Sequence, residues 1–152
     1  MILTGTRFGD IEYTDEDIVH FSDGLIGFPN SHRYVVLSVK ENSPFRWLQS
    51  LDEPALAFLC ADPERYVADY SPLISERHAR ALEMTSETPY LLLCTAAIPR
   101  GKPEEMTLNL AGPIVVNAEL RKGRQIVLED GAYTIRHRVF PQAERVREAV
   151  AA

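Results

Sequence analysis

The chain has 152 residues, of which 45% are hydrophobic and 25% are charged, and its formal net charge is −6. These proportions are ordinary for a globular protein, and the length favours one domain with its own core. No apolar run approaches the roughly 20 residues of a membrane span, and the first residues lack the pattern of a secretory signal. We therefore predict a cytoplasmic protein without membrane contact, with a single domain over 1–140 and a frayed tail over 141–152.

Short apolar segments separated by turn signals recur along the chain, which is typical of a barrel or a sandwich. The runs 34–39 and 90–98 are almost continuously apolar, as expected of strands covered on both faces. Segment 132–140 alternates between polar and apolar residues and indicates a half-exposed strand. We predict strands at 7–12, 17–21, 33–39, 56–61, 66–70, 90–98, 106–110, 113–120, 124–129 and 132–140.

Glycines mark the turns between these segments. Asp23-Gly24 and Asp130-Gly131 are strong hairpin signals, and Lys122-Gly123 is a weaker one, because glycine accepts positive φ at no steric cost.

One short helix is expected from Ser75 to about Leu82. Ser75 can cap the free amides of the first turn, and Glu76 suits the positive end of the helix. Two turns are marginal alone, so this helix must pack on a sheet. The predicted fold is mainly β: a small closed or partly open antiparallel β-barrel with one short helix.

The reactive residue types form no recognised catalytic or metal-binding pattern. Cys60 and Cys94 lie in apolar runs and are expected to be buried thiols, although a disulfide between neighbouring strands stays open. Asp62 precedes a proline and is more typical of a turn former than of a catalytic acid. His78 lies among arginines and is expected in solvent. We predict no enzyme, no metal and no cofactor.

The charges are distributed unevenly. Residues 1–23 hold six acidic residues against Arg7 alone, whereas residues 121–152 hold seven basic residues against four acidic ones. An acidic end disfavours direct nucleic-acid binding and would speed encounter with a basic protein. A solvated acidic face is the alternative.

Several segments, taken in order, resemble the FliW family of flagellar assembly factors over roughly residues 4 to 140. They are Thr6–Gly9, Phe21–Phe28, Phe45–Leu51, Cys60–Pro63, Met106–Asn117 and Gly123–Leu128.

The resemblance implies a cytoplasmic binding protein with two partners, flagellin and the RNA-binding translational regulator CsrA. In this partner switch, export of flagellin frees the FliW-like protein, which then sequesters CsrA and relieves repression of flagellin translation. The resemblance also implies that CsrA is inhibited allosterically, away from its RNA surface.

Trp47, Leu48, Gln49 and Leu51 are predicted to form an exposed apolar lip that holds an amphipathic end of flagellin. The alternative is that Trp47 lies in the core.

A second group of predicted partner-binding residues is Tyr70, Asn109, Pro113 and Asn117. Pro113 would keep a sheet edge open, and Asn109 would hydrogen-bond a docked peptide. Alternatively, Asn109 and Asn117 satisfy backbone groups where a strand bends.

Two other functions stay open at this point. A small-molecule or flavin-binding barrel, with or without redox activity, would suit a β domain with an apolar mouth. An oligonucleotide-binding barrel is weakly suggested by the basic-aromatic segment 133–140.

Overall fold

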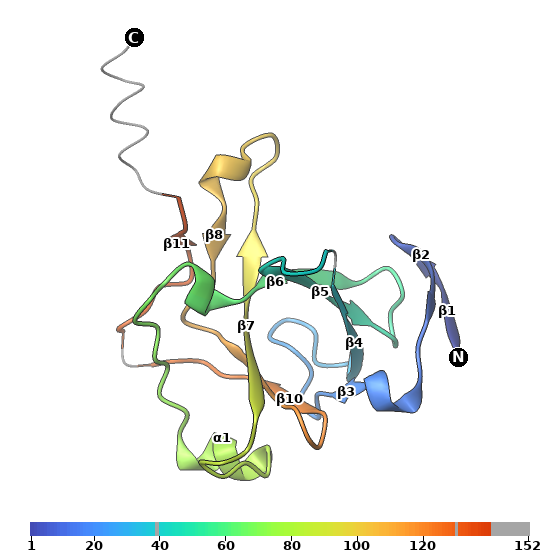
Figure 1. The fold of residues 1–152 in the computed structure, drawn as a ribbon, viewed down its shortest axis with the longest axis horizontal. Helices are drawn as coiled ribbons and strands as arrows, with labels where there is room; N and C mark the ends of the chain where they lie inside the picture. The colour runs from blue at the N-terminus through green and yellow to red at the C-terminus, as the bar shows by residue number, and fades with distance from the viewer. Residues whose placement is uncertain (39, 130, 141–152) are drawn as a thin grey trace.

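The computed structural model describes residues 1–38, 40–129 and 131–140, which form two sheets and one α-helix (Figure 1). The predicted tail over 141–152 lies outside the described residues. The strands are β1 (Ile2–Thr6), β2 (Gly9–Glu12), β3 (Val19–His20), β4 (Arg33–Ser38), β5 (Phe45–Ser50), β6 (Ala57–Ala61), β7 (Tyr90–Ala97), β8 (Thr107–Leu108), β9 (Ile114–Asn117), β10 (Lys122–Gln125) and β11 (His137–Arg138). The helix α1 is Glu76–Ala81, and 3-10 turns cover Asp15–Asp17, Pro63–Arg65 and Pro103–Glu105.

The larger sheet closes on itself. Its strands follow the order β11-β8-β7-β6-β5-β4-β3-β10-β9, and β9 pairs in turn with β7, where Leu93 lies opposite Ile114. The predicted mainly β fold with one short helix is confirmed. The expectation of a wholly antiparallel arrangement is wrong at one place, because β10 runs parallel to β3 where Lys122 lies opposite His20.

The inside of this ring is filled by side chains from nearly every strand. Because side chains alternate between the two faces of a strand, one set points inward along the whole ring. A ligand in the interior, as a flavin-binding barrel would need, would have to displace these side chains. They are Val19, Phe21, Leu25, Tyr34, Leu48, Cys60, Leu93, Ile114 and Val116.

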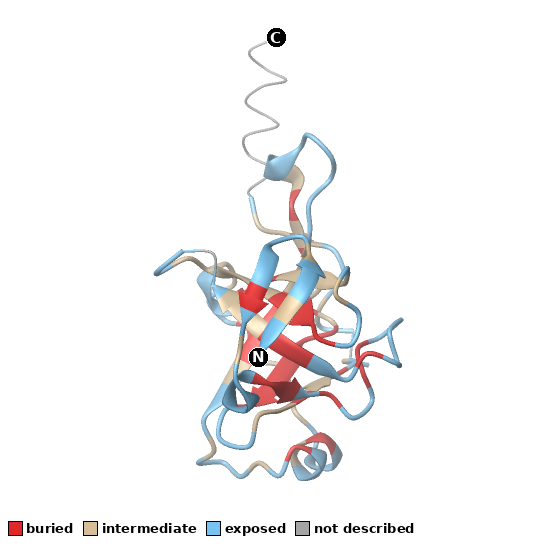
Figure 2. Cartoon of the chain, turned by 90° about the vertical axis from the view of Figure 1, so that its right-hand side faces the viewer, coloured by how far each residue is buried: buried red, intermediate tan, exposed pale blue. Residues whose placement is uncertain are grey.

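The β1–β2 hairpin forms a second layer over the outer face of β4 and β5. Leu3 and Tyr13 pack there against Ile18, Val35 and Leu51. Figure 2 views the molecule from this side, with the largely exposed hairpin in front of the buried strands. Burying each large side chain contributes about 1.5–3 kcal/mol, so this small cluster is enough to hold the hairpin in place.

A third cluster covers the outer face of β7 and β9. Tyr70 and Leu82, from the connection between β6 and β7, pack there against Leu92, Cys94 and Val115. The short helix α1 therefore gains its stability from packing, as predicted. Ser75 occupies its N-cap position but makes no side-chain capping hydrogen bond.

The two cysteines are buried and free. In the pairing of β6 with β7, Cys60 lies opposite Thr95, and Cys94 lies opposite Ala61. Neighbouring positions on a strand point to opposite faces, so the two thiols face different clusters and cannot form a disulfide. The prediction of buried thiols is confirmed.

Several predicted strands differ from the structure. Segment 66–70 contains no strand, because the Val67 amide donates to the Pro63 carbonyl (2.8 Å) and the Tyr70 amide donates to the Val67 carbonyl (3.2 Å), which makes turns. Just before it, Asp62 accepts a hydrogen bond from the Glu64 amide (3.1 Å) and begins a 3-10 turn. This confirms Asp62 as a turn former. Strands β1 and β5 were not predicted, and the strands over 17–21, 106–110, 113–120 and 132–140 are shorter than expected.

Two of the predicted turns also differ. Lys122 and Gly123 lie within β10, and the turn before them is made by Arg121, whose φ is +56°. Asp23-Gly24 lies in a longer loop between β3 and β4, where Gly24 has a φ of +65°. The predicted turn at Asp130 lies outside the described residues.

Candidate functional site

The predicted exposed lip is wrong for two of its leucines. Leu48 points into the ring with 0% of its surface exposed, and Leu51 is buried under the β1–β2 hairpin at 6%. Both therefore contribute to the core, and neither can contact a docked partner without a rearrangement.

Gln49 is also buried. Its Nε2 donates to the carbonyl oxygens of Ser50 (2.9 Å), Pro54 (2.9 Å) and Leu56 (3.2 Å). These bonds hold the turn between β5 and β6, so the role that the structure gives Gln49 is structural.

Trp47 faces outward and is half-buried. Its neighbours across the strands are Leu37 on β4 and Leu59 on β6, which share its face and its intermediate burial. The tip of the β1–β2 hairpin reaches over it: the Phe8 ring lies 5.2 Å from the Trp47 ring, and Arg7 Cζ lies 4.4 Å from it. We name Phe8, Leu37, Trp47 and Leu59 the Trp47 ladder. It is a partly exposed apolar strip between two covered areas of the sheet.

Tyr70 is buried, and its hydroxyl donates to the Leu110 carbonyl at 2.6 Å. Burial raises the pKa of this phenol, so it stays protonated and keeps the bond. Tyr70 thus joins the connection after β6 to the bend between β8 and β9.

The bend around Pro113 is covered. The Pro113 carbonyl accepts from the Ile126 amide at 2.8 Å, and Pro113 itself is buried. The predicted open sheet edge is therefore wrong. Asn109 is half-buried, and its Oδ1 is buried without a hydrogen-bond partner among the described residues.

Asn117 is buried and satisfies backbone groups on both sides. Its Nδ2 donates to the Leu82 carbonyl (2.8 Å), and its Oδ1 accepts from the amides of Glu119 (3.0 Å) and Leu120 (3.1 Å). The structural alternative is confirmed for this residue, which ties the end of α1 to β9.

The acidic amino-terminal residues lie at the surface. We name Asp10, Glu12, Asp15, Glu16 and Asp17 the acidic segment, and all five are exposed. Hydrogen bonds from the Thr14 amide (2.9 Å) and hydroxyl (3.2 Å) lower the pKa of Asp17, which keeps its charge at neutral pH.

A pocket of about 320 Å³ opens where β3, β10 and the end of α1 meet. His20, His32, Lys122 and Arg124 line it, over an apolar part formed by Phe21, Leu82 and neighbours. No local motif predicts this pocket, because its residues are far apart in the sequence.

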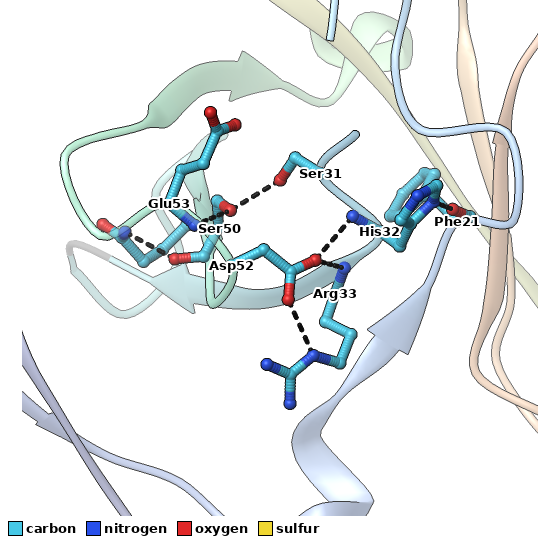
Figure 3. Close-up of polar contacts among 8 residues, drawn as sticks. Phe21, Ser31, His32, Arg33, Ser50, Asp52 and Glu53 are labelled. Carbon is cyan, nitrogen blue, oxygen red and sulfur yellow. Dashed lines mark hydrogen bonds and ion pairs between the residues drawn. The ribbon is translucent and has the colours of Figure 1, made fainter. Parts of the chain in front are cut away.

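Asp52 fixes the backbone at His32, one of the residues that line the pocket, and Figure 3 shows its hydrogen bonds. Its Oδ2 accepts from the amides of His32 (2.7 Å) and Arg33 (3.0 Å), and its Oδ1 accepts from Arg33 Nε (2.8 Å). Burial opposes ionisation of this carboxyl, but these hydrogen bonds and the Arg33 charge outweigh it and lower its pKa. Nearby, His32 Nδ1 donates to the Phe21 carbonyl at 3.0 Å.

We expect Asp52→Asn to lower the free energy of unfolding by about 1–2 kcal/mol at pH 7. The pKa of Asp52 is lower in the folded state, so the unfolded chain binds more protons and this stabilisation is lost as pH falls through the folded pKa. The difference from the parent should therefore shrink below about pH 4. Urea unfolding at pH 7 and pH 3 measures it, with the exposed Asp69→Asn as control. An unchanged difference would contradict the assignment.

His78 is buried, with 9% of its surface exposed, so its predicted solvent position is wrong. Its Nδ1 has no hydrogen-bond partner among the described residues. Burial, followed by the charges of Arg124 and Arg77, lowers its pKa and keeps it neutral. Arg80, on the same helix, lies in solvent and pairs with Glu76 at 2.6 Å, whereas His78 is packed against the protein.

Comparison with known proteins gives the family. The model of the FliW protein family matches residues 2–139. The chain belongs to the FliW family. A flagellar assembly factor FliW of Desulfitobacterium hafniense is 40% identical over 144 residues, covering 95% of this chain and 94% of that protein. One of Magnetococcus marinus is 37% identical over 145 residues, covering 95% of this chain and 88% of that protein.

A solved structure agrees with these FliW relatives. The crystal structure of a flagellar assembly factor FliW superposes with a TM-score of 0.85 at 32% identity, covering 93% of this chain and 99% of that chain. Among the described residues, no helix is long and apolar enough to cross a membrane.

Proposed function

We propose that this protein is a cytoplasmic flagellar assembly factor that works by docking alone. It binds flagellin and the translational regulator CsrA, and it sequesters CsrA when flagellin is exported, which relieves repression of flagellin translation. Each partner lowers the concentration of free protein available to the other, so no covalent chemistry, cofactor or direct contact with nucleic acid is required. The FliW relatives named as flagellar assembly factors support this proposal.

One structural observation carries the proposal. The β1–β2 hairpin contributes Phe8 to the Trp47 ladder and, through β2, Asp10 and Glu12 to the acidic segment. Two surfaces of different chemistry therefore adjoin on one element. A partner bound to one surface therefore obstructs binding of the second partner to the other surface. Competition between flagellin and CsrA requires such an arrangement.

The chemistry of each surface suggests its partner. The Trp47 ladder offers an aromatic anchor between apolar side chains, which suits an amphipathic segment such as an end of flagellin. The acidic segment suits a basic regulator, chiefly by speeding its encounter. Of the predicted partner-binding residues, Trp47 belongs to one of these surfaces, and the half-buried Asn109 lies outside both of them and stays a prediction. Leu48, Gln49, Leu51, Tyr70, Pro113 and Asn117 are buried.

Trp47→Ala should weaken flagellin binding at least about tenfold, because it removes the central ring of the ladder. Tyr90→Ala is the matched control, since Tyr90 is an exposed aromatic ring on β7, outside the ladder. Calorimetric titration with purified flagellin measures both variants, after circular dichroism has shown that they are folded. Equal affinities for the two variants would contradict the placement of flagellin on the ladder.

The double variant Asp15→Asn with Glu16→Gln tests the acidic segment. It should slow association with CsrA about three- to tenfold at low salt and leave dissociation nearly unchanged, because exposed charges act mainly on encounter. Glu64→Gln with Asp69→Asn removes two exposed carboxylates from the connection between β6 and α1 and serves as control. Stopped-flow measurements of the rate of association with CsrA, at low and high salt, compare the two double variants. An association rate with CsrA that does not change with salt concentration would contradict electrostatic steering by the acidic segment.

A further inference from the structure

The pocket between β3, β10 and α1 brings two cationic side chains of one strand together with two histidines from other segments. Lys122 and Arg124 alternate along β10, His20 lies on β3, and His32 lies just before β4. None of the described residues that line the pocket is acidic. A concave site with converging cationic groups favours an anion, because its walls reduce the screening by solvent.

Apart from Ser22, the rest of the lining is apolar. Leu82 and Phe21 are almost completely buried, with 2% and 0% of their surface exposed, and Gly123 adds no side chain between them. The Leu82 carbonyl at the end of α1 is already hydrogen-bonded to Asn117 Nδ2 at 2.8 Å, so it is not an unpaired acceptor facing an anion. A volume of about 320 Å³ lies at the lower end of the range of small-molecule sites.

Both strong cations have an acidic neighbour outside the lining. Lys122 Nζ contacts Glu83 Oε2, and Arg124 Nη1 lies 3.4 Å from Asp23 Oδ2. The Glu83 and Asp23 side chains are 56% and 67% exposed, so these pairs are weak and open to exchange. An incoming anion can therefore replace a rim carboxylate as the partner of either cation.

We propose that this pocket binds a small organic anion, a phosphorylated or carboxylated compound with an apolar body. Lys122 and Arg124 contact the anionic group, His20 and His32 form the polar wall, and the apolar body rests against Ala81 and Leu82. This inference is independent of the proposed docking of flagellin and CsrA.

The test is an amide NMR titration of the full chain with four probes: phenyl phosphate, benzoate, phenol and inorganic phosphate. At least one of the two aromatic anions should produce saturable shifts at the amides of Ser22, Leu82 and Gly123. Comparison of phenyl phosphate with benzoate separates the two anionic groups. Phenol lacks the charge and inorganic phosphate lacks the apolar body, so each should bind at least about threefold more weakly.

Variants locate the site. Lys122→Gln should weaken binding of the better probe about three- to tenfold, whereas Glu83→Gln should strengthen it by releasing Lys122 from its pair. Lys102→Gln is the matched control, because Lys102 is an exposed lysine in a weak pair with Glu105 (3.9 Å) on the connection between β7 and β8. The proposal is overturned if neither aromatic anion produces saturable shifts, or if phenol binds with the same affinity as the better anion. It is also overturned if Lys102→Gln and Lys122→Gln change the affinity equally.

Discussion

Replacing Gly123 by alanine should lower the free energy of unfolding by about 3 kcal/mol, through overpacking alone. A Cβ at this position would lie 2.4 Å from Phe21 Cζ and 2.5 Å from Phe21 Cε2, far inside van der Waals contact. Phe21 has no exposed surface and packs edge-on against Tyr34 at 5.2 Å, so a shift of its ring would disturb the packing inside the ring of strands. Chemical denaturation of the parent and of Gly123→Ala measures the difference.

A double-mutant cycle separates this clash from an effect on β10 itself. Phe21→Leu removes the ring carbons that the new methyl group would meet. Gly123→Ala should therefore cost less in the Phe21→Leu background than in the parent. The same cost in both backgrounds would show that the strand, and not the contact with Phe21, demands glycine.

Asn117→Ala should lower the free energy of unfolding by about 2–3 kcal/mol. The change leaves the Leu82 carbonyl and the amides of Glu119 and Leu120 without their side-chain partner, in a place where Asn117 itself is only 1% exposed. Thermal and urea unfolding measure the loss. Hydrogen exchange at α1 should also rise, because the amide of Asn117 ties that helix to β9.

Asn109→Ala is the control for this result. Asn109 is half-buried, and its Oδ1 has no partner among the described residues, so its removal should cost less than about 1 kcal/mol. If the two asparagine variants lose equal stability, the hydrogen bonds of Asn117 do not explain its effect.

Each of the two surfaces in the proposed function includes residues of the β1–β2 hairpin: Phe8 in the Trp47 ladder, and Asp10 and Glu12 in the acidic segment. The hairpin is held by the small cluster of Leu3, Tyr13 and their contacts, whereas the ring is closed by strand pairing all the way round. We therefore expect substitutions on the hairpin to change the proposed partner binding with little effect on the core. This separation makes the hairpin residues Phe8, Asp10 and Glu12 informative positions for mutagenesis.

The sequence by itself determined the features that depend on neighbours along the chain. The apolar runs at 34–39 and 90–98 predicted the strands β4 and β7, because a strand covered on both faces needs apolar residues at consecutive positions. The turn at Asp62-Pro63 and the helix after Ser75 were also found from local preferences. The burial of Cys60 and Cys94 followed from the apolar runs that contain them.

Tertiary structure decided everything that depends on register and on partners distant in sequence. Trp47 faces outward and Leu48 inward because β5 pairs with β4 and β6 in one register, and a shift by one residue would exchange them. Lys122 and Gly123 suggest a turn by composition, yet pairing with β9 draws them into β10 and brings Gly123 against Phe21, about a hundred positions away. The burial of His78 and the assembly of the pocket lined by Lys122 and Arg124 have the same origin. Closing the ring brings together residues that are distant in sequence, and no local pattern encodes these contacts.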